Sequence, residues 1–466
     1  MIIRAIERGI RWLLGSWRHL SLDAKVVGVI AVGNWLLLFA NHTTVAATTD
    51  GTLWRLFPGI GGAIFLAVTG IAAFAYPVRD IRQRAAFTPR ARWVHLALIV
   101  LVFVIVPTIA SIVLRETGKP YTYIHDGALM IEEAARKLLV GRNPYAADYL
   151  DTPLYYWPMV NNPALYHLTY FPFLFLVTVP FVWLFDHFGM FWDQRYMYLP
   201  AFVGTLAIVR SLVRRTEHRL ALVALVGLNP QLFPFVVEGR NDFFVLLFLF
   251  AGIALLQRER RTLGSLAVAV AAAAKLHALF LLPFLVMYLV ATRKPRTIGT
   301  ALRALTPLIP AAVFLLVTFA PFLINDWNAF YDDVVRYNAG GAAWTYPISG
   351  MGFSALLLAL GIIAFRQADF PFAVIEIAVA TPIALYTMYR LWRDPTIAQM
   401  LFGYGLTLLV FLFFGRYFQG NYLGYIIAVV SAVPFLIAEQ RPLRKTRSRR
   451  VRAAAGTASP IDAPAD

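Results

Sequence analysis

The residue of this chain best suited to act as a base is an aspartate at the predicted start of a short helix. Asp126 lies in the segment TYIHDGALMIEEAARKLLVGRNPY, directly after His125 and two turns before Glu132. The spacing of Leu, Met and Ala predicts an amphipathic helix from Asp126 to about Val140, ended by Gly141, with its apolar stripe on the bilayer surface. Asp is also a favoured helix N-cap, so the sequence leaves a capping role and a catalytic role open.

A second polar cluster interrupts the apolar pattern at GLNPQLFPFVVEGRNDFFVLLF. Charged side chains beside lipid are costly and by default mark function, whereas the alternative is a hairpin turn whose Asn or Asp caps the next helix. We take four residues of this cluster as candidates for substrate binding: Glu238, Arg240, Asn241 and Asp242.

Two further segments place cations among apolar residues. Lys275 and His277 lie in AAAAKLHALF, where a lysine must snorkel, pair with an acid or meet an anionic ligand, and the run of small residues favours a broken helix with a ligand-facing lysine. FGRYFQGNY adds Arg416 and Asn421, and this arginine needs a partner. With His125 and Glu132, these four residues complete the predicted binding set.

The segment INDWNAFYDDVVRYNAGGAAWTYPISG sets aromatic residues next to acids and amides. Such residues bind sugars, because rings stack on C–H faces while carboxylates bind hydroxyl groups. A solvated amphipathic surface helix explains the pattern equally well.

The composition is that of a polytopic membrane protein. The 466 residues are 59% hydrophobic and only 14% charged, with a mean hydropathy of +0.65. The net charge of +17 gathers in short basic segments, which act as topology signals, so we expect no nucleic-acid partner. The chain has no Cys, which excludes disulfides, thiolate nucleophiles and Cys-based metal sites.

The apolar segments predict an all-α fold with roughly 11–13 transmembrane helices. They cover residues 24–41, 57–77, 93–115, 168–185, 196–213, 220–236, 241–257, 262–291 (one long helix or two broken ones), 303–324, 348–365, 370–392, 396–415 and 421–438. Strict alternation conflicts with the basic segment 213–219, so a segment between 168 and 213 must be re-entrant, broken or misassigned. A similar conflict at 348–392 suggests a half-helix on the outer face.

The charged loops then predict on which side of the membrane each connecting segment lies. The segments expected outside are 116–167, 237–243, 325–350 and 416–421, and those expected in the cytoplasm are 213–219, 257–262 and 292–303. Residues 1–22 are predicted to form a cytoplasmic interfacial helix, residues 23–440 the transmembrane domain, and residues 441–466 a basic, disordered cytoplasmic tail.

The order of these motifs resembles the C-superfamily of integral membrane glycosyltransferases, and within it most closely the bacterial polyprenyl-phosphate-mannose-dependent mannosyltransferases of glycosyltransferase family 87. The matching pieces are the acid of IHDGALMIEEAARKLLVGRNPY, the aromatic–Pro motif YHLTYFPF, the NP followed by EGRND, and the lysine of AAAAKLH. They span residues 93 to about 291. Two spans precede the one before the acidic loop, where one or none is usual in that family.

The resemblance implies an inverting transferase of the plasma membrane with its catalytic face outside and both termini cytoplasmic. Asp126 would be the catalytic base toward an acceptor hydroxyl, and Lys275, Arg240 and Arg416, in that order, would bind the polyprenyl phosphate. The expected partners are a lipid-linked sugar donor and a glycan, glycolipid or protein acceptor. We assign no metal ligands; the cofactor is unknown, and a divalent metal (Mg²⁺, Mn²⁺ or Ca²⁺) is compatible with the sequence but not required by it.

Two other functions fit part of the pattern. A lipid or polysaccharide transporter would need charges near the bilayer midplane, for which Glu376 is the best candidate. An enzyme resembling O-antigen ligases or polymerases would use Arg and His of a late loop and could dispense with Asp126.

Overall fold

The computed structural model describes residues 15–44, 56–57, 59–159, 162–295 and 297–456. The first half of the chain contains η1 (Trp17–His19), α2 (Leu22–Thr44), α4 (Ile60–Arg82), α5 (Pro89–Val100), η2 (Leu101–Ile105), α6 (Val106–Glu116), α7 (Asp126–Leu139), η3 (Pro153–Tyr156), η4 (Pro163–Leu165), α8 (Pro172–His187), α9 (Arg195–Ser211) and α10 (Thr216–Gly227). The second half contains α11 (Phe233–Glu238), α12 (Asp242–Gln257), α13 (Arg261–Ala274), α14 (Leu276–Leu279), α15 (Leu281–Ala291), α16 (Ile298–Leu305), η5 (Thr306–Leu308), α17 (Ile309–Asn325), α18 (Trp327–Tyr331), η6 (Asp332–Arg336), α19 (Tyr337–Ala339), β1 (Ser349–Gly350), α20 (Phe353–Ala359), α21 (Phe372–Arg393), α22 (Ile397–Phe414), β2 (Tyr417–Phe418) and α23 (Gly420–Gly456).

The chain is an all-α polytopic membrane protein, as predicted. Seven helices of the described residues are long and apolar enough to cross a membrane: Leu22–Ala40, Ile60–Arg82, Pro89–Glu116, Ile298–Asn325, Phe372–Arg393, Ile397–Phe414 and Gly420–Glu439. Four shorter apolar helices accompany them: Pro172–His187, Asp242–Gln257, Arg261–Ala274 and Leu276–Ala291. The strands β1 and β2 form one short parallel pair, in which Ser349 is opposite Tyr417.

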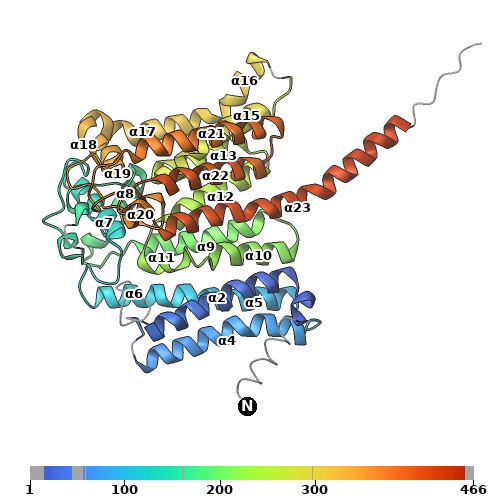
Figure 1. Cartoon of the computed structure of the whole chain (residues 1–466), viewed down its shortest axis with the longest axis horizontal. Helices are drawn as coiled ribbons and strands as arrows, with labels where there is room; N and C mark the ends of the chain where they lie inside the picture. Colours follow the sequence, from blue (N-terminus) through green and yellow to red (C-terminus); the bar gives the residue numbers. More distant parts are fainter. Residues whose placement is uncertain (1–14, 45–55, 58, 160–161, 296, 457–466) are drawn as a thin grey trace, which may run out of the picture.

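The long helices lie side by side, and the polar loops gather at one end of the bundle (Figure 1). This end, which we call the α7 end, carries α7, α18, α19 and α20, and therefore most of the segments predicted to share one side of the membrane. The opposite end carries the basic turn between α4 and α5 and the short helix α16. The candidate half-helix near 348–365 is the short α20 at the α7 end.

Helix α8 explains the conflict in the predicted alternation, because it starts and finishes beside α7. At its start, Tyr170 lies against Gly127, and at its finish Arg136 pairs with Asp186 at 3.2 Å. The turn that follows α8 also contacts α7, since the backbone N–H of Gln194 donates to Glu132 at 2.8 Å. Helix α8 is therefore not a crossing, and α9 can lead from the α7 end to the basic segment at 213–219.

The segment 262–291 is a broken helix rather than a continuous one. Lys275 has an extended backbone (φ −155°, ψ 138°), which ends α13 before α14 and α15 begin. Arg261, at the start of α13, donates to Thr292, just after α15, at 3.3 Å, so the chain reverses direction at Lys275. The predicted break is confirmed, and it places Lys275 at a turn.

Helices α12 and α13 approach closely because glycines face each other between them. A Cβ on Gly252 would lie 2.9 Å from the backbone oxygen of Gly264, and one on Gly264 would lie 3.1 Å from that of Gly252. Small residues permit such contact between membrane helices, where close packing replaces the hydrophobic effect as the main attraction. This hairpin brings Asp242, at the start of α12, to Lys275, after the end of α13.

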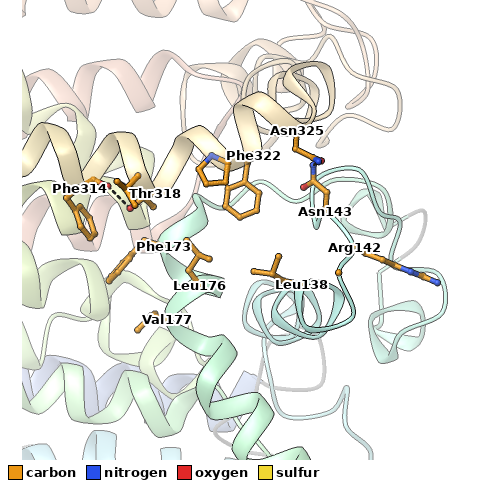
Figure 2. A pocket seen from close by; sticks show the side chains of 13 residues that line it. Leu138, Arg142, Asn143, Phe173, Leu176, Val177, Phe314, Thr318, Phe322 and Asn325 are labelled. Carbon is orange, nitrogen blue, oxygen red and sulfur yellow. Dashed lines mark hydrogen bonds between the residues drawn. The ribbon is translucent and has the colours of Figure 1, made fainter.

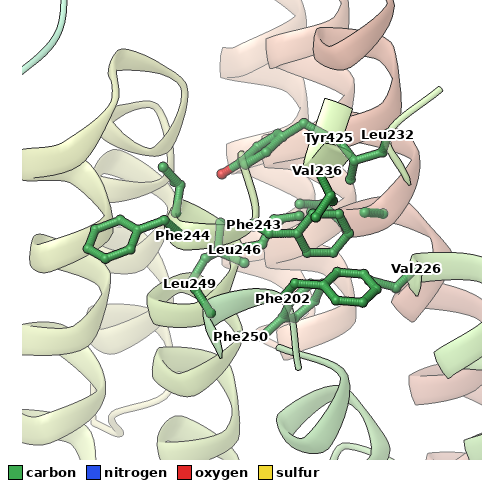
Figure 3. Close-up of a cluster of buried hydrophobic side chains, with 14 of the residues drawn as sticks. Phe202, Val226, Leu232, Val236, Phe243, Phe244, Leu246, Leu249, Phe250 and Tyr425 are labelled. Carbon is green, nitrogen blue, oxygen red and sulfur yellow. The ribbon is translucent and has the colours of Figure 1, made fainter. Parts of the chain in front are cut away.

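A core of large aromatic and aliphatic side chains joins α9, α10, α11, α12 and α23 (Figure 3). Phe202 of α9 meets Phe243 of α12 edge to face, with ring centroids 4.7 Å apart. The core lies directly beneath the loop that contains Arg240 and so fixes the position of that loop.

The apolar stripe of α7 packs inside the protein, so the prediction that it rests on the bilayer is wrong. Leu129 and Ala134 are fully buried, Met130 is nearly so, and only Leu139 near the helix end is substantially exposed. The physical reason is that α8 is apolar on the side facing α7 and covers the stripe.

The predicted terminal segments fall partly outside the described residues. Residues 1–14 of the expected interfacial helix are not described, and η1 and α2 follow them. Helix α23 continues to Gly456, whereas the sequence predicts disorder from residue 441; Arg, Lys and Ala, which dominate this stretch, are strong helix formers. Residues 457–466 lie outside the description.

Candidate active site

Asp126 is the first residue of α7, and His125 precedes it as the N-cap. The predicted helix is confirmed, ending at Leu139 with Gly141 in a left-handed conformation (φ 76°). The carboxylate also accepts a hydrogen bond within the first turn of α7, because the backbone N–H of Gly127 donates to Asp126 Oδ1 at 2.7 Å. His125 Nδ1 lies 2.7 Å from the same oxygen. One oxygen of Asp126 is thus held in place, whereas Oδ2 has no hydrogen-bond partner among the described residues.

The loop with Asp126 is bonded to the loop with Arg240. The backbone N–H of His125 donates to the carbonyl of Glu238 at 2.8 Å. Arg195 reinforces this join, because its Nη1 donates to the carbonyls of Tyr123 at 2.7 Å and Val237 at 2.9 Å. Two segments separated by more than a hundred residues are therefore fixed against each other at the candidate base.

Tyrosines from separate segments surround Asp126. A Cβ on Gly127 would lie only 2.0 Å from the hydroxyl oxygen of Tyr170, so only glycine permits this approach. Burial, together with the negative charge of Asp126, raises the pKa of Tyr170, and the same two causes raise that of Tyr346. Tyr337 also lies within the electrostatic influence of Asp126. These aromatic faces suit a sugar ring next to the carboxylate.

Asp126 is ionised although it is poorly hydrated. Burial acts to raise the pKa of its carboxyl group, but the neighbouring His125 and Arg240 outweigh it, and the pKa lies below the usual value. Its side chain keeps 14% of its surface exposed. A charged, accessible carboxylate of this kind can accept a proton from a ligand hydroxyl.

Arg240 is placed by the left-handed glycine that ends α11 (Gly239, φ 85°). Its Nε donates to Glu238 at 3.0 Å, its Nη1 donates to Asn421 at 3.1 Å, and its guanidinium lies 4.2 Å from the ring centroid of Phe235. Burial acts to lower the pKa of Arg240, but Glu238, Asp242 and Asp126 raise it, so the cation is permanent. Within the described residues, Nη2 is left free for an anionic ligand.

Lys275 joins the same network through Asp242. Its Nζ donates to Asp242 Oδ1 at 2.6 Å and to Asn241 Oδ1 at 2.9 Å, and Asn421 donates to Asp242 Oδ2 at 3.0 Å. Since Asn421 also accepts from Arg240, the residues predicted at 238–242, 275 and 421 form one connected site. An ammonium has three donors, and among the described residues two of those of Lys275 have acceptors. The third can bind a ligand.

Exposure separates the predicted residues into two groups. His125, Asp126, Glu238, Arg240 and Lys275 all keep a partly exposed side chain, between 12% and 22%. The more deeply buried group is Glu132, Asn241, Asp242, His277, Arg416 and Asn421. The first group can touch a ligand, and the second can position it.

Two predicted residues, Glu132 and Arg416, are committed to contacts within the protein, and His277 is only partly satisfied. Arg115 binds both carboxylate oxygens of Glu132, at 2.7 and 2.9 Å. Arg416 finds its partners in backbone carbonyls, donating to those of Tyr346, Ala368 and Arg366. His277 packs edge-on against Tyr422, and its buried Nδ1 has no hydrogen-bond partner in the described part of the chain. We therefore leave Glu132 and Arg416 out of the proposed ligand contacts.

A buried ionic cluster beneath α7 escaped the sequence analysis. Arg115 bridges Glu132 and Asp193, and Arg195 binds Asp193 through two nitrogens. Burial acts to raise the pKa of Asp193, but the two arginines hold it far below the usual value. The signal in the sequence is the charged WDQR motif between two apolar segments.

The acids of the 325–350 segment hold that segment together. Asp326 caps α18, accepting from the backbone N–H of Ala329 at 3.0 Å. Asp333 accepts from His167 at 2.7 Å and from the backbone N–H of Leu168 at 2.8 Å. Its burial raises its carboxyl pKa to about 6. The segment thus contributes aromatic walls such as Tyr337 and Tyr346, while Asp326 and the buried Asp333 hold its backbone in place.

Among the described residues, no group of three or more His, Asp or Glu side chains is placed to hold a metal ion. Glu238, two residues before Arg240, is already bonded to that arginine. We therefore assign no metal ligands around Asp126 and derive no step through a metal ion.

An apolar groove of ≈ 710 Å³ opens between the end of α7, the start of α8, and α17 (Figure 2). Phe173, Leu176 and Phe314 form its walls, and Asn143 donates to Asn325 at 2.8 Å at its polar end. Phe322, which also lines the groove, packs on Tyr145, and the hydroxyl of Tyr145 donates to the carbonyl of Tyr170. Aromatic contacts therefore link the groove to the surroundings of Asp126.

Comparison with known proteins places this geometry in a family. The family model described as glycosyltransferase family 87 matches residues 168–415. The matched range includes Tyr170, Glu238–Asp242 and Lys275, and Asp126 lies before it. No curated protein matches the chain significantly.

Proposed function

The chain belongs to glycosyltransferase family 87, and we propose that it transfers a sugar from a polyprenyl-phosphate-linked donor to an acceptor hydroxyl at the outer face of a bacterial plasma membrane. Membership in this family makes the chain a glycosyltransferase of the membrane. The donor, the acceptor and the side of the membrane are our proposal. The observation that carries it is an ionised, accessible Asp126 held next to Arg240 within a ring of tyrosines.

In the proposed reaction Asp126 accepts the proton of the acceptor hydroxyl while the hydroxyl oxygen attacks the anomeric carbon. The bond between that carbon and the phosphate oxygen breaks, and the electron pair leaves with the polyprenyl phosphate. Attack opposite the leaving group inverts the anomeric configuration, and no covalent intermediate with the protein forms. Tyr170 and Tyr346 line the space beside Asp126 where the sugar would stack.

Arg240 and Lys275 stabilise the charge that develops on the leaving phosphate. Arg240 ranks first because, of these two cations, it is the one whose charge lowers the pKa of Asp126, and within the described residues its Nη2 has no partner. Lys275 ranks second, since Asp242 already takes much of its charge. This order reverses the one expected from the sequence.

The apolar groove beside α8 suits the first isoprene units of the donor. Its walls are hydrocarbon, and Thr318 does not interrupt them because its hydroxyl donates to the carbonyl of Phe314 at 2.7 Å (Figure 2). The basic segments lie at the opposite end of the bundle, and by the positive-inside rule that end faces the cytoplasm. The α7 end then faces outward, where polyprenyl-linked sugars are used.

The decisive experiment offers the purified chain a panel of radiolabelled polyprenyl-phospho-sugars, mannose first, together with glycan acceptors. We expect one donor to be consumed, in a product whose anomeric configuration is inverted by NMR. Parallel reactions with a chelator determine whether a metal takes part. If a folded chain consumes no donor of the panel, the polyprenyl-phosphate proposal is wrong; retention of configuration would exclude Asp126 as a base in direct displacement.

A further inference from the structure

A second polar pocket lies at the opposite end of the bundle from Asp126. It has a volume of ≈ 410 Å³ and lies between the end of α4 and the start of α5. The family match begins at residue 168, so the pocket lies outside it. None of its residues contributes to the proposed transfer reaction, and it needs an explanation of its own.

The pocket is positively charged. Arg79 and Arg90 line it, and no acidic side chain does. The nearest acids are already used, since Arg92 pairs with both Asp23 and Asp80. Arg79 lies 4.8 Å from the ring centroid of Phe87, a contact that orients its guanidinium without neutralising it. Two cations therefore share a cavity in which, among the described residues, nothing balances them.

The start of α5 adds backbone donors and an unused ring nitrogen. Thr88 caps this helix of 12 residues by accepting from the backbone N–H of Ala91, and the helix dipole places further positive charge at its start. His95 also lines the pocket and is 6% exposed. Its Nε2 contacts the carbonyl of Ala72 at 3.0 Å, whereas its buried Nδ1 has no partner among the described residues. An unsatisfied polar atom beside two free cations points to a missing ligand.

The pocket continues into a surface that faces lipid. Val94 and Leu98, one and two turns further along α5, line it and are 55% and 49% exposed. They belong to the candidate span Pro89–Glu116, so hydrocarbon covers them in a membrane. A free phosphate ion would gain nothing from these side chains, but the acyl chains of a phospholipid would contact them.

We propose that this pocket binds the head group of an anionic phospholipid, with Arg79, Arg90 and the start of α5 around the phosphate and the acyl chains along Val94 and Leu98. A hydroxyl group on the head group, as in phosphatidylglycerol, satisfies the free lone pair of His95. Basic pockets between membrane helices recognise such head groups through the same charges.

The test measures lipid binding to the full-length purified chain by native mass spectrometry, with phosphatidylglycerol and phosphatidylcholine as probes. We expect phosphatidylglycerol to be retained in preference to phosphatidylcholine. Arg79→Gln and Arg90→Gln should each weaken its binding about fivefold, corresponding to ~1 kcal/mol per arginine at a membrane surface. Arg84→Gln is the matched control, because Arg84 belongs to the same turn but does not line the pocket, and its binding should be unchanged.

A second variant guards against a loss of folding. Ala91→Phe fills the pocket and keeps both arginines, so it should displace phosphatidylglycerol by sterics alone. Inorganic phosphate is added in a separate arm. Equal retention of both lipids, unchanged binding in Arg79→Gln and Ala91→Phe, or full displacement by inorganic phosphate would each overturn the proposal.

Discussion

Helix α7 contributes an acid to each of two ionic clusters, which differ in whether their charges are directly paired. Glu132 belongs to a closed cluster with Arg115, Asp193 and Arg195, in which every charge has an opposite charge and almost no surface is exposed. Asp126 belongs to an open cluster, in which its carboxylate and the guanidinium of Arg240 influence each other without a direct bond. Two turns of one helix thus separate a structural acid from a candidate catalytic one.

The comparison shows that burial and charge alone do not identify a functional acid. Removing a charge from the closed cluster leaves its partners buried and unpaired, so the cost appears in stability. Removing the charge from Asp126 leaves a fold whose neighbouring groups keep other partners, so the cost should appear in catalysis. The predictions below test this division of roles.

The largest expected effect is on transfer by Asp126→Asn. The amide keeps the shape of the side chain and can still accept from the backbone N–H of Gly127, but it cannot accept a proton from the acceptor. We expect kcat to fall about 10⁴-fold, the upper end of what general-base catalysis contributes. Initial rates with radiolabelled donor measure this, and thermal unfolding should be unchanged. A near-normal kcat in this variant would mean that Asp126 only stabilises the start of α7.

Arg115→Met tests the closed cluster. It leaves Glu132 and Asp193 buried without their shared cation, and we expect a loss of about 3–5 kcal/mol in the free energy of unfolding. Denaturant titration of the detergent-solubilised chain measures the loss. The protein that remains folded should keep its kcat, because no member of this cluster reaches the ligand. Reduced kcat at full stability would instead place the cluster in the catalytic machinery.

Arg240→Gln tests the cation of the open cluster. We expect kcat to fall about 10²-fold through the loss of charge stabilisation at the leaving phosphate, with the fold intact. Arg366→Gln is a control, since Arg366 is exposed and its contact with Arg416 uses only its backbone carbonyl. An effect on KM alone would mean that Arg240 binds the donor without stabilising the transition state.

The sequence predicted the parts of the site that depend on local pattern. Helix α7, its glycine stop and the break at Lys275 all follow from periodicity, small residues and turn-forming residues. The meeting of Arg240 with Asn421 was not predicted as a contact. Arg240 was chosen because charged residues beside lipid by default mark function, and Asn421 because it lies in a polar segment between two apolar ones.

What could not be predicted depends on pairing between distant segments. Helix α8 is as apolar as a helix that crosses the membrane. Only its contacts with α7 at both ends show that it does not cross the bundle. The sequence does not show that Glu132 is structural and Asp126 is not. The difference depends on Arg115, which comes from the preceding helix and pairs with Glu132. Arg416 was expected to need a partner and was a candidate for binding the phosphate, but it donates to backbone carbonyls.

The smallest effect concerns a third ionic pair, between His167 and Asp333, which fixes the aromatic segment over the site. Burial acts to lower the pKa of His167, but the bond to Asp333 outweighs burial, and the net shift is upward. Burial raises the pKa of Asp333 to about 6. Both groups hold protons more tightly in the folded chain than in the unfolded one. The stabilisation by His167 is therefore complete below about pH 6.5 and disappears as the pH rises through its folded pKa.

We accordingly expect the free energy of unfolding to decrease from mildly acidic to alkaline pH, by about 1.4 kcal/mol for each unit of pKa shift. His167→Gln should flatten this slope, whereas the exposed His187, changed in the same way, should leave it intact. Thermal unfolding across the pH range measures both. A wild-type stability that increases with pH would mean that the imidazole is neutral in the fold. The pair would then join the aromatic segment to the bundle by a hydrogen bond alone, and would lack the charge that distinguishes the closed cluster under α7.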